Sequence, residues 1–231
     1  MIKGFGILEM LVALSLGLGV LTVIIAHSTE AARVDRKVTA NQERLEAIFH
    51  AVDTIKSDLN KCGMRLQEAR PLSGLAPFTS TANAFACSYG VADEALLEGA
   101  VRGQQAIKVA GNDFFKKGRA VLLYDLSGQA WEMNEIEYRL DGALVLKNRL
   151  QNDFARSSTV VAMKKVEYRY EAPRRVLKRK ADNGTFQPLL EEVSDFYVTF
   201  FPDANSVLYR IEVNRKEQVR GYIFLLNLVQ P

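Results

Sequence analysis

The chain has 231 residues, of which 48% are hydrophobic and 25% are charged, and its formal net charge at pH 7 is +3. So small a charge argues against a protein whose main task is to bind nucleic acid. The length is sufficient for an apolar N-terminal segment and one ordinary globular domain of about 100–200 residues.

The first element of the chain is an almost wholly apolar stretch from Phe5 to Ala26. A helix needs roughly 20 apolar residues to cross the hydrocarbon core of a bilayer, so this stretch predicts a transmembrane helix. One ionisable residue, Glu9, lies near its start. A carboxylate at the centre of a membrane costs on the order of 3 kcal/mol and usually has a partner. The group that pairs with Glu9 is therefore the first functional question.

Two simpler interpretations of this stretch are a cleaved secretory signal and a plain single-pass anchor. A secretory signal has a positive n-region, an apolar region of about 7–15 residues and a small-residue cleavage site. Here the apolar region is longer and contains Glu9, and the sequence Ala26-His27-Ser28 that follows is a poor cleavage site. A plain anchor explains the length of the stretch but not the position of the glutamate.

The sequence from Lys3 to Leu14 resembles the N-terminal signature of type IV pilins and of the pseudopilins of type II secretion. In that family a dedicated peptidase removes a short basic leader that ends in Gly, and the new N-terminal residue is N-methylated. The resemblance implies a leader of residues 1–4, cleavage between Gly4 and Phe5, and methylation of Phe5. Glu9 would correspond to the glutamate that pairs with the terminal amine of a neighbouring subunit during filament assembly.

Electrostatics is consistent with the assembly role that the resemblance implies for Glu9. Cleavage would place a cation four residues before Glu9 on the same helix face, and a helix N-terminus favours a nearby anion. Opposite charges from adjacent subunits could fix their register, because each charge would be penalised if it were buried alone. The sequence departs from the family pattern at Gly6, where Thr or Ser is common.

A helical period continues beyond the apolar stretch. The absence of Pro and Gly between Thr22 and Cys62 predicts one continuous helix from about Phe5 to about Leu66, amphipathic over residues 27–66. Its apolar residues recur at intervals of three, four or seven: Val34, Val38, Leu45, Phe49, Val52, Ile55, Leu59, Cys62 and Leu66. A globular domain packed on this part of the helix explains the stripe. A coiled coil is the alternative, although the charges at its e and g positions would not be ordered.

Residues 67–231 predict a globular domain that is mainly β-structure from residue 106. Before that point Pro, Gly and polar residues indicate loops, with a short helical turn expected between Ala92 and Val101. From residue 106 the hydrophobic period falls to two. The expected strands are Ile107–Val109, Ala120–Tyr124, Trp131–Leu140, Ala143–Lys147, Val160–Tyr170, Val176–Lys180, Thr185–Leu190, Val193–Phe201, Val207–Val213 and Tyr222–Leu228. The predicted fold class is α+β: a long N-terminal helix packed against an antiparallel β-domain of two sheets or one curved sheet, a pilin-like arrangement.

Two later segments resemble W-type minor pilins and J-type pseudopilins. The first is Asp58-Leu59 followed by Cys62-Gly63 and a basic residue, at the end of the long helix. Gly63 is expected where the helix crosses closely over a strand, because it has no side chain. The second segment begins at the tyrosine-bearing strand Val166–Tyr170 and continues to Leu228.

The chain has two cysteines, Cys62 and Cys87. If the domain lies in the periplasm, an oxidising compartment, they are expected to form a disulfide. That bridge would contribute roughly 3–4 kcal/mol on the chain-entropy model. Two free, buried thiols are the alternative. The cysteines form no C-x-x-C motif and no Cys/His ligand spacing, so neither a metal nor a cofactor is expected.

Three other groups of polar residues are weaker candidates for a site. A basic run could bind phosphate but is more typical of the solvated face of a strand: Arg174, Arg175, Lys178, Arg179 and Lys180. Possible calcium ligands do not match the calcium-loop pattern and are expected to be solvated: Asp93, Glu94, Glu98, Asp203 and Asn205. His27 and His50 belong to no motif with a nucleophile, so no enzymatic activity is expected.

The resemblance implies a minor pilin or pseudopilin, a structural subunit of the tip or priming complex that initiates assembly of a type IV pilus or type II secretion pseudopilus. The implied partners are other minor pilins or pseudopilins, the major subunit, the prepilin peptidase and the inner-membrane assembly platform. The implied location is the inner membrane, crossed once, with the C-terminal domain in the periplasm and later at the filament tip. Two alternatives remain open: a tip-located adhesin or substrate-contact module, and a membrane-anchored periplasmic protein outside any filament.

Overall fold

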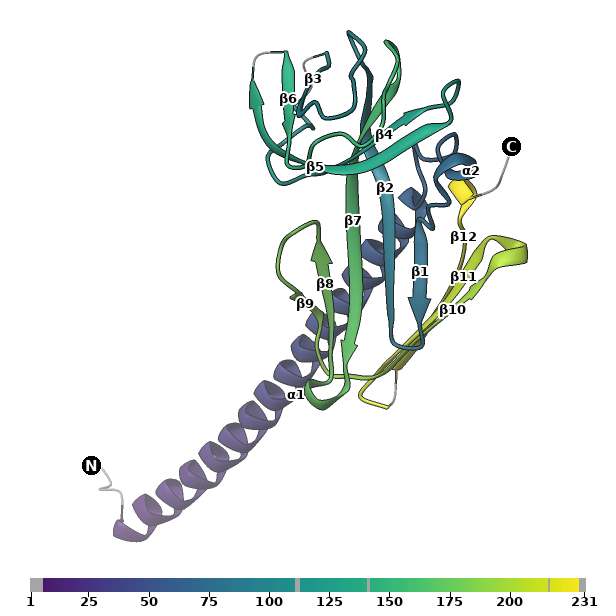
Figure 1. The fold of residues 1–231 in the computed structure, drawn as a ribbon. Coiled ribbons are helices and arrows are strands. Elements are labelled where there is room, and N and C mark those ends of the chain that lie inside the picture. The colour runs from purple at the N-terminus through teal and green to yellow at the C-terminus, as the bar shows by residue number, and fades with distance from the viewer. Residues whose placement is uncertain (1–5, 111–112, 141, 216, 229–231) are drawn as a thin grey trace. The chain divides into compact units, whose positions relative to one another are not determined.

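The computed structural model describes all residues except 1–5, 111–112, 141, 216 and 229–231, and the side chain of Leu8. The fold class is α+β, with one long N-terminal helix and a large antiparallel β-region (Figure 1). The chain divides into two compact units, Met1–His50 and Ala51–Pro231.

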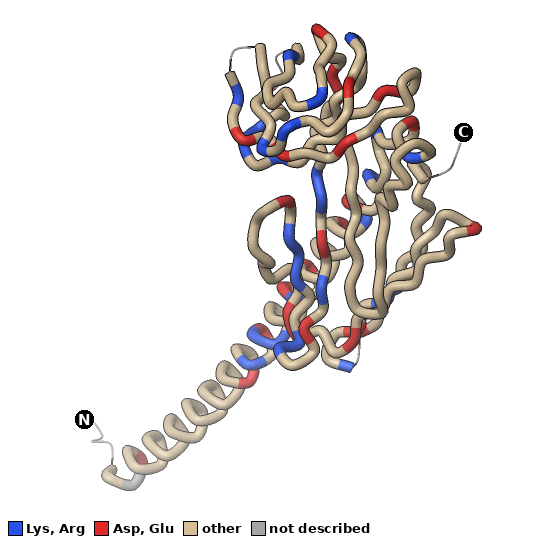
Figure 2. The backbone as a smooth tube through the Cα atoms, in the orientation of Figure 1, with Lys and Arg blue, Asp and Glu red and all other residues tan. Residues whose placement is uncertain are grey.

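The described part of the first unit consists of helix α1 (Ile7–Lys61), which continues into the second unit. The described apolar side chains from Ile7 to Ile25 are exposed. Figure 2 shows this part of α1 almost without charged residues. Among the described residues, α1 is the one helix long and apolar enough to cross a membrane, judged by length and composition.

The apolar stripe predicted along residues 27–66 divides into an exposed part and a buried part. Its members in the first unit are exposed, from Val34 to Phe49. From Val52 onward its members are buried, and Ile55 and Leu59 are completely inaccessible. The second unit therefore takes the last three turns of α1 into its core.

α1 ends at Lys61, so the prediction that it continues to about Leu66 is wrong. Gly63 has a φ of 79°, a left-handed conformation that commonly terminates helices. Its N–H donates to the carbonyl oxygen of Ser88 at 2.9 Å instead of continuing the helical ladder. A short helix, α2 (Arg70–Ser73), follows.

The second unit is organised around the 13-residue strand β7 (Thr159–Glu171) of a nine-stranded antiparallel sheet. β7 pairs on one edge with β2 (Ala84–Ala95), and on the other first with β4 (Ala120–Asp125) and then with β8 (Val176–Ala181). The remaining strands are β1 (Phe78–Thr81), β3 (Ala106–Lys108), β5 (Ala130–Leu140), β6 (Ala143–Leu146) and β9 (Gln187–Leu190). Figure 1 shows β3 to β6 gathered at one end of the long strands.

A second sheet has three strands in the order β10 (Val193–Phe201), β11 (Ser206–Val213) and β12 (Glu217–Phe224). A backbone hydrogen bond of 3.1 Å from Val198 to Ala82 joins β10 to the β1–β2 hairpin. Short 3₁₀ turns complete the unit: η1 (Ala172–Arg174), η2 (Pro202–Ala204) and η3 (Leu226–Leu228). The described residues thus form two sheets, one of the two arrangements that the sequence allowed.

The strands predicted from residue 106 onward agree with the structure within a few residues, except that β12 begins at Glu217 and ends at Phe224, followed by η3. The expectation of loops before residue 106 is wrong for residues 78–95, which form β1 and β2. The polar residues Thr79 to Asn83 do lead into a turn, but it is the tight turn of the β1–β2 hairpin. The helical turn expected between Ala92 and Val101 is absent: this segment holds the end of β2 and isolated β-bridges.

Candidate functional site

Glu9 lies in the first turn of α1 and is exposed. Its Oε2 accepts a hydrogen bond of 3.2 Å from the backbone N–H of Gly6. N–H groups at the start of a helix have no intrahelical acceptor and favour a nearby anion, so Glu9 caps its own helix. Gly4 and Phe5, the predicted cleavage and methylation residues, lie outside the described residues.

The end of α1 in the second unit carries a buried polar cluster of Asp58, Tyr168 of β7 and Arg179 of β8. Asp58 is only 4% exposed. Its Oδ2 accepts hydrogen bonds from the Tyr168 hydroxyl (2.6 Å) and from Arg179 Nε (2.8 Å), and its Oδ1 accepts from Arg179 Nη2 (3.2 Å). The guanidinium thus binds both carboxylate oxygens, the strongest geometry for such a pair.

The electrostatics of this cluster keeps both donors protonated. Burial, together with the adjacent Asp58 carboxylate, raises the pKa of the Tyr168 hydroxyl far above its ordinary value. The hydrogen bond to Asp58 raises the pKa of Arg179 further above its already high value. Both groups therefore stay protonated near neutral pH, and their hydrogen bonds to Asp58 connect α1 to the sheet.

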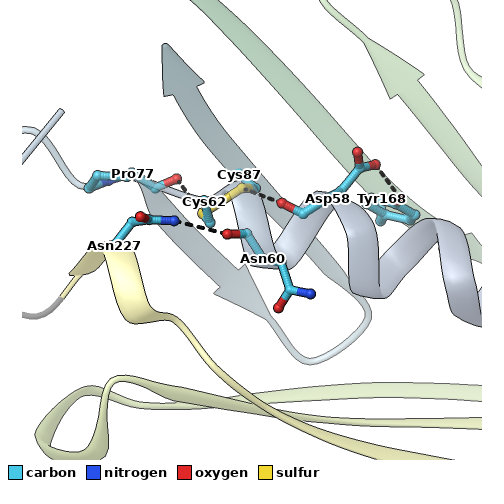
Figure 3. Close-up of a disulfide and its surroundings, with 7 residues drawn as sticks. All are labelled: Asp58, Asn60, Cys62, Pro77, Cys87, Tyr168 and Asn227. Atoms are coloured by element: carbon cyan, nitrogen blue, oxygen red, sulfur yellow. Dashed lines mark hydrogen bonds between the residues drawn. A yellow bond between two sulfur atoms is a disulfide. The ribbon is translucent and has the colours of Figure 1, made fainter. Parts of the chain in front are cut away.

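A disulfide between Cys62 and Cys87 joins the residue that follows α1 to β2 (Figure 3). The Cα atoms are 5.4 Å apart, a normal spacing for a disulfide, and both residues are fully buried. Cys87 Sγ lies 3.4 Å from the carbonyl oxygen of Asp58, a contact drawn as a dashed line in Figure 3. The disulfide and the Asp58 cluster therefore hold the same last turn of α1.

The turn η3, near the C-terminus, binds to the end of α1 and the segment after it. Asn227 Nδ2 donates to the carbonyl oxygen of Asn60 at 2.9 Å, and Gln67 Nε2 donates to Asn227 Oδ1 at 3.2 Å. Arg70 Nη1 donates to the carbonyl oxygen of Leu228 at 2.6 Å. We call these three hydrogen bonds the C-terminal latch.

The latch explains why a glycine occupies position 63. A Cβ atom added to Gly63 would lie 2.5 Å from Leu228 Cδ2 and 2.9 Å from the carbonyl oxygen of Asn227. The segment nearest to the missing Cβ of Gly63 is thus η3, which the sequence did not identify. A strand also lies close to Gly63, as predicted: it is β2, whose Ser88 carbonyl oxygen accepts a hydrogen bond from the Gly63 N–H at 2.9 Å.

The basic run at residues 174–180 is not one solvated face. Arg179 faces inward to Asp58, and Leu177, two residues earlier on the same strand face, is also buried. Lys178 pairs with Glu171 at 2.9 Å. Two further ion pairs are Arg174 with Glu171, at 3.9 Å, and Lys180 with Glu167, at 3.4 Å. The alternation Leu177, Arg179 was the sequence signal that could have identified Arg179 as inward.

The candidate calcium ligands do not converge as one group in the described chain. Asp93 forms an ion pair with Arg65, and Glu98 pairs with Lys108 at 3.0 Å. Asp203 lies in η2, within the second sheet. His27 and His50 are both exposed on α1.

The outer face of the second sheet exposes four aromatic side chains, which the sequence did not single out: Tyr197, Phe201, Tyr222 and Phe224. The rings of Tyr222 and Phe224 meet edge to face at 5.1 Å. Arg210 lies 5.8 Å from the centre of the Tyr197 ring. Exposed aromatic residues next to arginine are typical of protein interaction surfaces.

Comparison of the chain with models of known protein families gave no match, and comparison with curated proteins gave none either.

Proposed function

We propose that the protein is a minor pilin or pseudopilin, a structural subunit that joins the tip or priming complex of a type IV pilus or type II secretion pseudopilus. The observation that carries this proposal is Glu9, a carboxylate in the first turn of an exposed apolar helix. A plain membrane anchor has no use for such a group, which is penalised in hydrocarbon unless it is neutralised.

Processing would supply the group that neutralises Glu9. Cleavage between Gly4 and Phe5 exposes an amine next to Gly6, whose N–H is already bonded to Glu9. In an assembling filament the amine of one subunit pairs with Glu9 of its neighbour, and both charges leave lipid together. The domain beyond the helix lies in the periplasm, and the protein crosses the inner membrane once.

The layout of the chain supports this proposal. An apolar helix with exposed sides offers its surface first to lipid and then to the helices of other subunits. The exposed apolar residues between Val34 and Phe49 extend that surface beyond the apolar stretch. The end of the same helix is held to the β-sheets by a buried ion pair, a disulfide and the C-terminal latch. Such a connection can transmit force between the helix and the domain.

The test compares Glu9→Gln with Glu30→Gln, a matched change at an exposed glutamate further along α1. With equal amounts of both proteins in the membrane, Glu9→Gln should reduce filaments or secretion by roughly tenfold or more, because an unpaired charge remains in an apolar environment. Glu30→Gln should have little effect.

Mass spectrometry of the mature protein should find a methylated Phe5 as the first residue. The proposal is contradicted if the mature protein still begins with Met1 in a strain that cleaves the leaders of its other pilins.

A second candidate function, a substrate-contact or adhesive module at the filament tip, is favoured by the aromatic face of the second sheet. Replacing Tyr222 and Phe224 with Thr keeps β-propensity and removes the rings. Under this function the double variant assembles filaments normally but loses adhesion or secretion. Loss of the filaments themselves would instead assign the aromatic face to subunit assembly.

A further inference from the structure

The second sheet ends in a strand that pairs on one side alone. Among the described strands, β12 pairs with β11 only, and the order β10-β11-β12 makes it the outer strand (Figure 1). The opposite side of the same sheet is joined to the first sheet, because the Val198 N–H of β10 donates to the carbonyl oxygen of Ala82. The two sides of this sheet thus differ, and the unpaired one is the edge of β12.

The register of β11 and β12 determines which backbone groups point away from the sheet at this edge. Opposite residues of an antiparallel pair alternate between pairs that exchange two hydrogen bonds and pairs that exchange none. Just beyond the first pair of the register, the Leu225 N–H donates to the carbonyl oxygen of Asn205 at 2.6 Å, which fixes the alternation. The residues of β12 whose N–H and C=O groups point outward are therefore Gln218, Arg220, Tyr222 and Phe224.

These outward backbone groups have no hydrogen-bond partner within the part of the chain that the structure describes. Proteins usually protect such edges, for example by keeping the edge strand short or by placing Pro in it. In the first sheet β1 and β3 have four and three residues, and β9 contains Pro188. In contrast, β12 has eight residues and no Pro. An edge without these protections is a template for pairing with another strand.

The side chains at the same four positions lie on the exposed face of the sheet. Tyr222 and Phe224 are 52% and 57% exposed, although their rings contact each other. The Tyr222 hydroxyl is also hydrogen-bonded to Ser206 Oγ at 2.6 Å, which fixes the position of its ring. A strand added at this edge would place alternate side chains next to the two rings. Apolar side chains at those positions would remove ring surface from water.

The position of Arg220 favours an acidic residue on the added strand. Arg220 lies directly opposite Arg210 of β11, and like charges in such a pair are unfavourable. Arg210 forms an ion pair with Asp195 of β10, on its other side. Glu212 of β11 lies opposite Gln218 and not opposite Arg220. A carboxylate placed opposite Arg220 from the open side would therefore continue the alternation of charges across the sheet.

We propose that the edge of β12 binds an extended segment of another protein as a fourth, antiparallel strand of the three-stranded sheet. The segment would carry apolar residues opposite Tyr222 and Phe224 and an acidic residue opposite Arg220. In strand addition, main-chain hydrogen bonds supply affinity and alternate side chains supply specificity. The antiparallel direction matches the other pairs of this sheet and gives the more stable ladder. The proposal does not depend on the protein's role in a filament.

The experiment uses the full chain in phosphatidylcholine nanodiscs and a fluorescent synthetic peptide, Thr-Val-Thr-Leu-Thr-Glu-Thr-Ser-Thr, followed by fluorescence anisotropy. In the proposed register its Val, Leu and Glu lie opposite Phe224, Tyr222 and Arg220. Saturable binding with a dissociation constant at or below about 1 mM is expected. N-methylation of the Leu nitrogen removes an N–H that faces β12 and should weaken binding about fivefold or more. The matched control is N-methylation of the following Thr, whose N–H faces away from β12; it should change binding less than about twofold.

A charge exchange tests the position of the acidic residue. The wild type should bind the peptide with Glu about threefold or more tightly than the same peptide with Lys in that place. Arg220→Glu should reverse this preference. Arg149→Glu makes the same change at an exposed residue after β6 and should keep the preference of the wild type.

The proposal is overturned if the peptide does not saturate the protein, if the two N-methylated peptides bind alike, or if Arg220→Glu still prefers the peptide with Glu. Sedimentation of the full chain in detergent supplies the last arm. Dimers of the wild type that the peptide dissociates would also overturn the proposal, because a second copy would then occupy the edge of β12.

Discussion

At the scale of single residues, the side chain of Asp58 connects α1 to two strands of the second unit. It is buried and accepts three hydrogen bonds from Tyr168 and Arg179, which come from two different strands. Burying an ion pair is costly, and the pair is favourable only while both charges and their hydrogen bonds are present. Loss of the carboxylate therefore leaves a partly buried guanidinium without a counter-charge.

Asp58→Asn should lower the free energy of unfolding of the second unit by about 3 kcal/mol, near the low end of the range for a broken buried pair, because Asn can still accept hydrogen bonds. The matched control is Asp53→Asn, an exposed aspartate on the same helix that should change stability by less than about 0.5 kcal/mol. Thermal unfolding followed by near-ultraviolet circular dichroism measures both. Equal stability of the two variants would contradict the role assigned to Asp58.

A second buried carboxylate, Asp125, joins two loops at the end of β4. Its Oδ1 accepts hydrogen bonds from Ser127 Oγ (2.7 Å) and the Gly128 N–H (3.0 Å). Its Oδ2 accepts from the Ala155 N–H (3.2 Å) and from Ser158 Oγ (3.1 Å). These bonds, that of Ser127 first among them, hold the pKa of Asp125 well below its usual range.

The lowered pKa of Asp125 predicts a pH-dependent contribution to stability. A carboxyl group with a lowered folded-state pKa contributes fully above its unfolded-state pKa of about 3.9 and loses that contribution as pH falls toward the folded-state value. The wild type should therefore exceed Asp125→Asn in melting temperature at pH 6, and the difference should shrink at pH 3. Asp113→Asn, at a fully exposed carboxylate, should show no such convergence. A constant difference for Asp125→Asn between the two pH values would refute the prediction.

At the scale of secondary-structure elements, the end of α1 depends on Gly63 in two ways. The residue needs a left-handed backbone, and it must leave room for η3. Gly74 has a similar φ of 64°, but no atom lies within 4 Å of the position that a Cβ would occupy. The two glycines therefore separate backbone strain from steric exclusion.

Gly74→Ala should cost about 1 kcal/mol from the backbone alone. Gly63→Ala should cost about 1–3 kcal/mol more, because the added methyl group displaces Leu228 and weakens the C-terminal latch. Urea unfolding of both variants measures the difference, and amide exchange at Asn227 and Leu228 should increase only in Gly63→Ala. Equal costs at the two sites would show that η3 adjusts freely.

Much of this element-level organisation could be predicted from periodicity alone. Alternating apolar residues identified the later strands, and the run without Pro or Gly identified α1. The hairpin of β1 and β2 was missed because its turn residues, Thr81 to Asn83, outweighed the short alternation of Phe85, Cys87 and Tyr89. The pairing of β7 with three separate strands could not be predicted, because a single sequence carries no signal for non-local register.

The cluster at the end of α1 could be predicted only in part, for the same reason. The sequence marked Asp58, Cys62 and Gly63 as a group, but not the partners that explain them. Arg179 was hidden within a basic run, and Tyr168 could not be distinguished from other aromatic strand residues. Leu228 lies far along the chain from Gly63, and no local pattern connects the two.

At the scale of the whole molecule, the division into two units predicts separable behaviour. The first unit exposes apolar side chains along a single helix, whereas the second has its own core and includes the last turns of α1 from Ala51. The apolar stretch should govern membrane partition, and the residues from Ala51 onward should govern folding.

Removal of residues 1–40 should therefore give a protein that is soluble without detergent and unfolds cooperatively, because every buried apolar residue of the second unit is retained. Removal of residues 1–60 also deletes Ile55, Asp58 and Leu59, and should abolish cooperative unfolding. Calorimetry and size-exclusion chromatography compare the two. If the protein that lacks only residues 1–40 aggregates under the same conditions, the division of the chain into two units is contradicted.

The C-terminal latch has a consequence for the order of events during biosynthesis. Asn60 and Asn227 are 167 positions apart, yet they are hydrogen-bonded in the finished protein. A nascent polypeptide leaves the ribosome from its N-terminus, so α1 emerges long before the turn that covers its end. Synthesis of η3 thus sets the earliest moment at which the latch can close, and until then the end of α1 that it covers is open to chaperones and proteases.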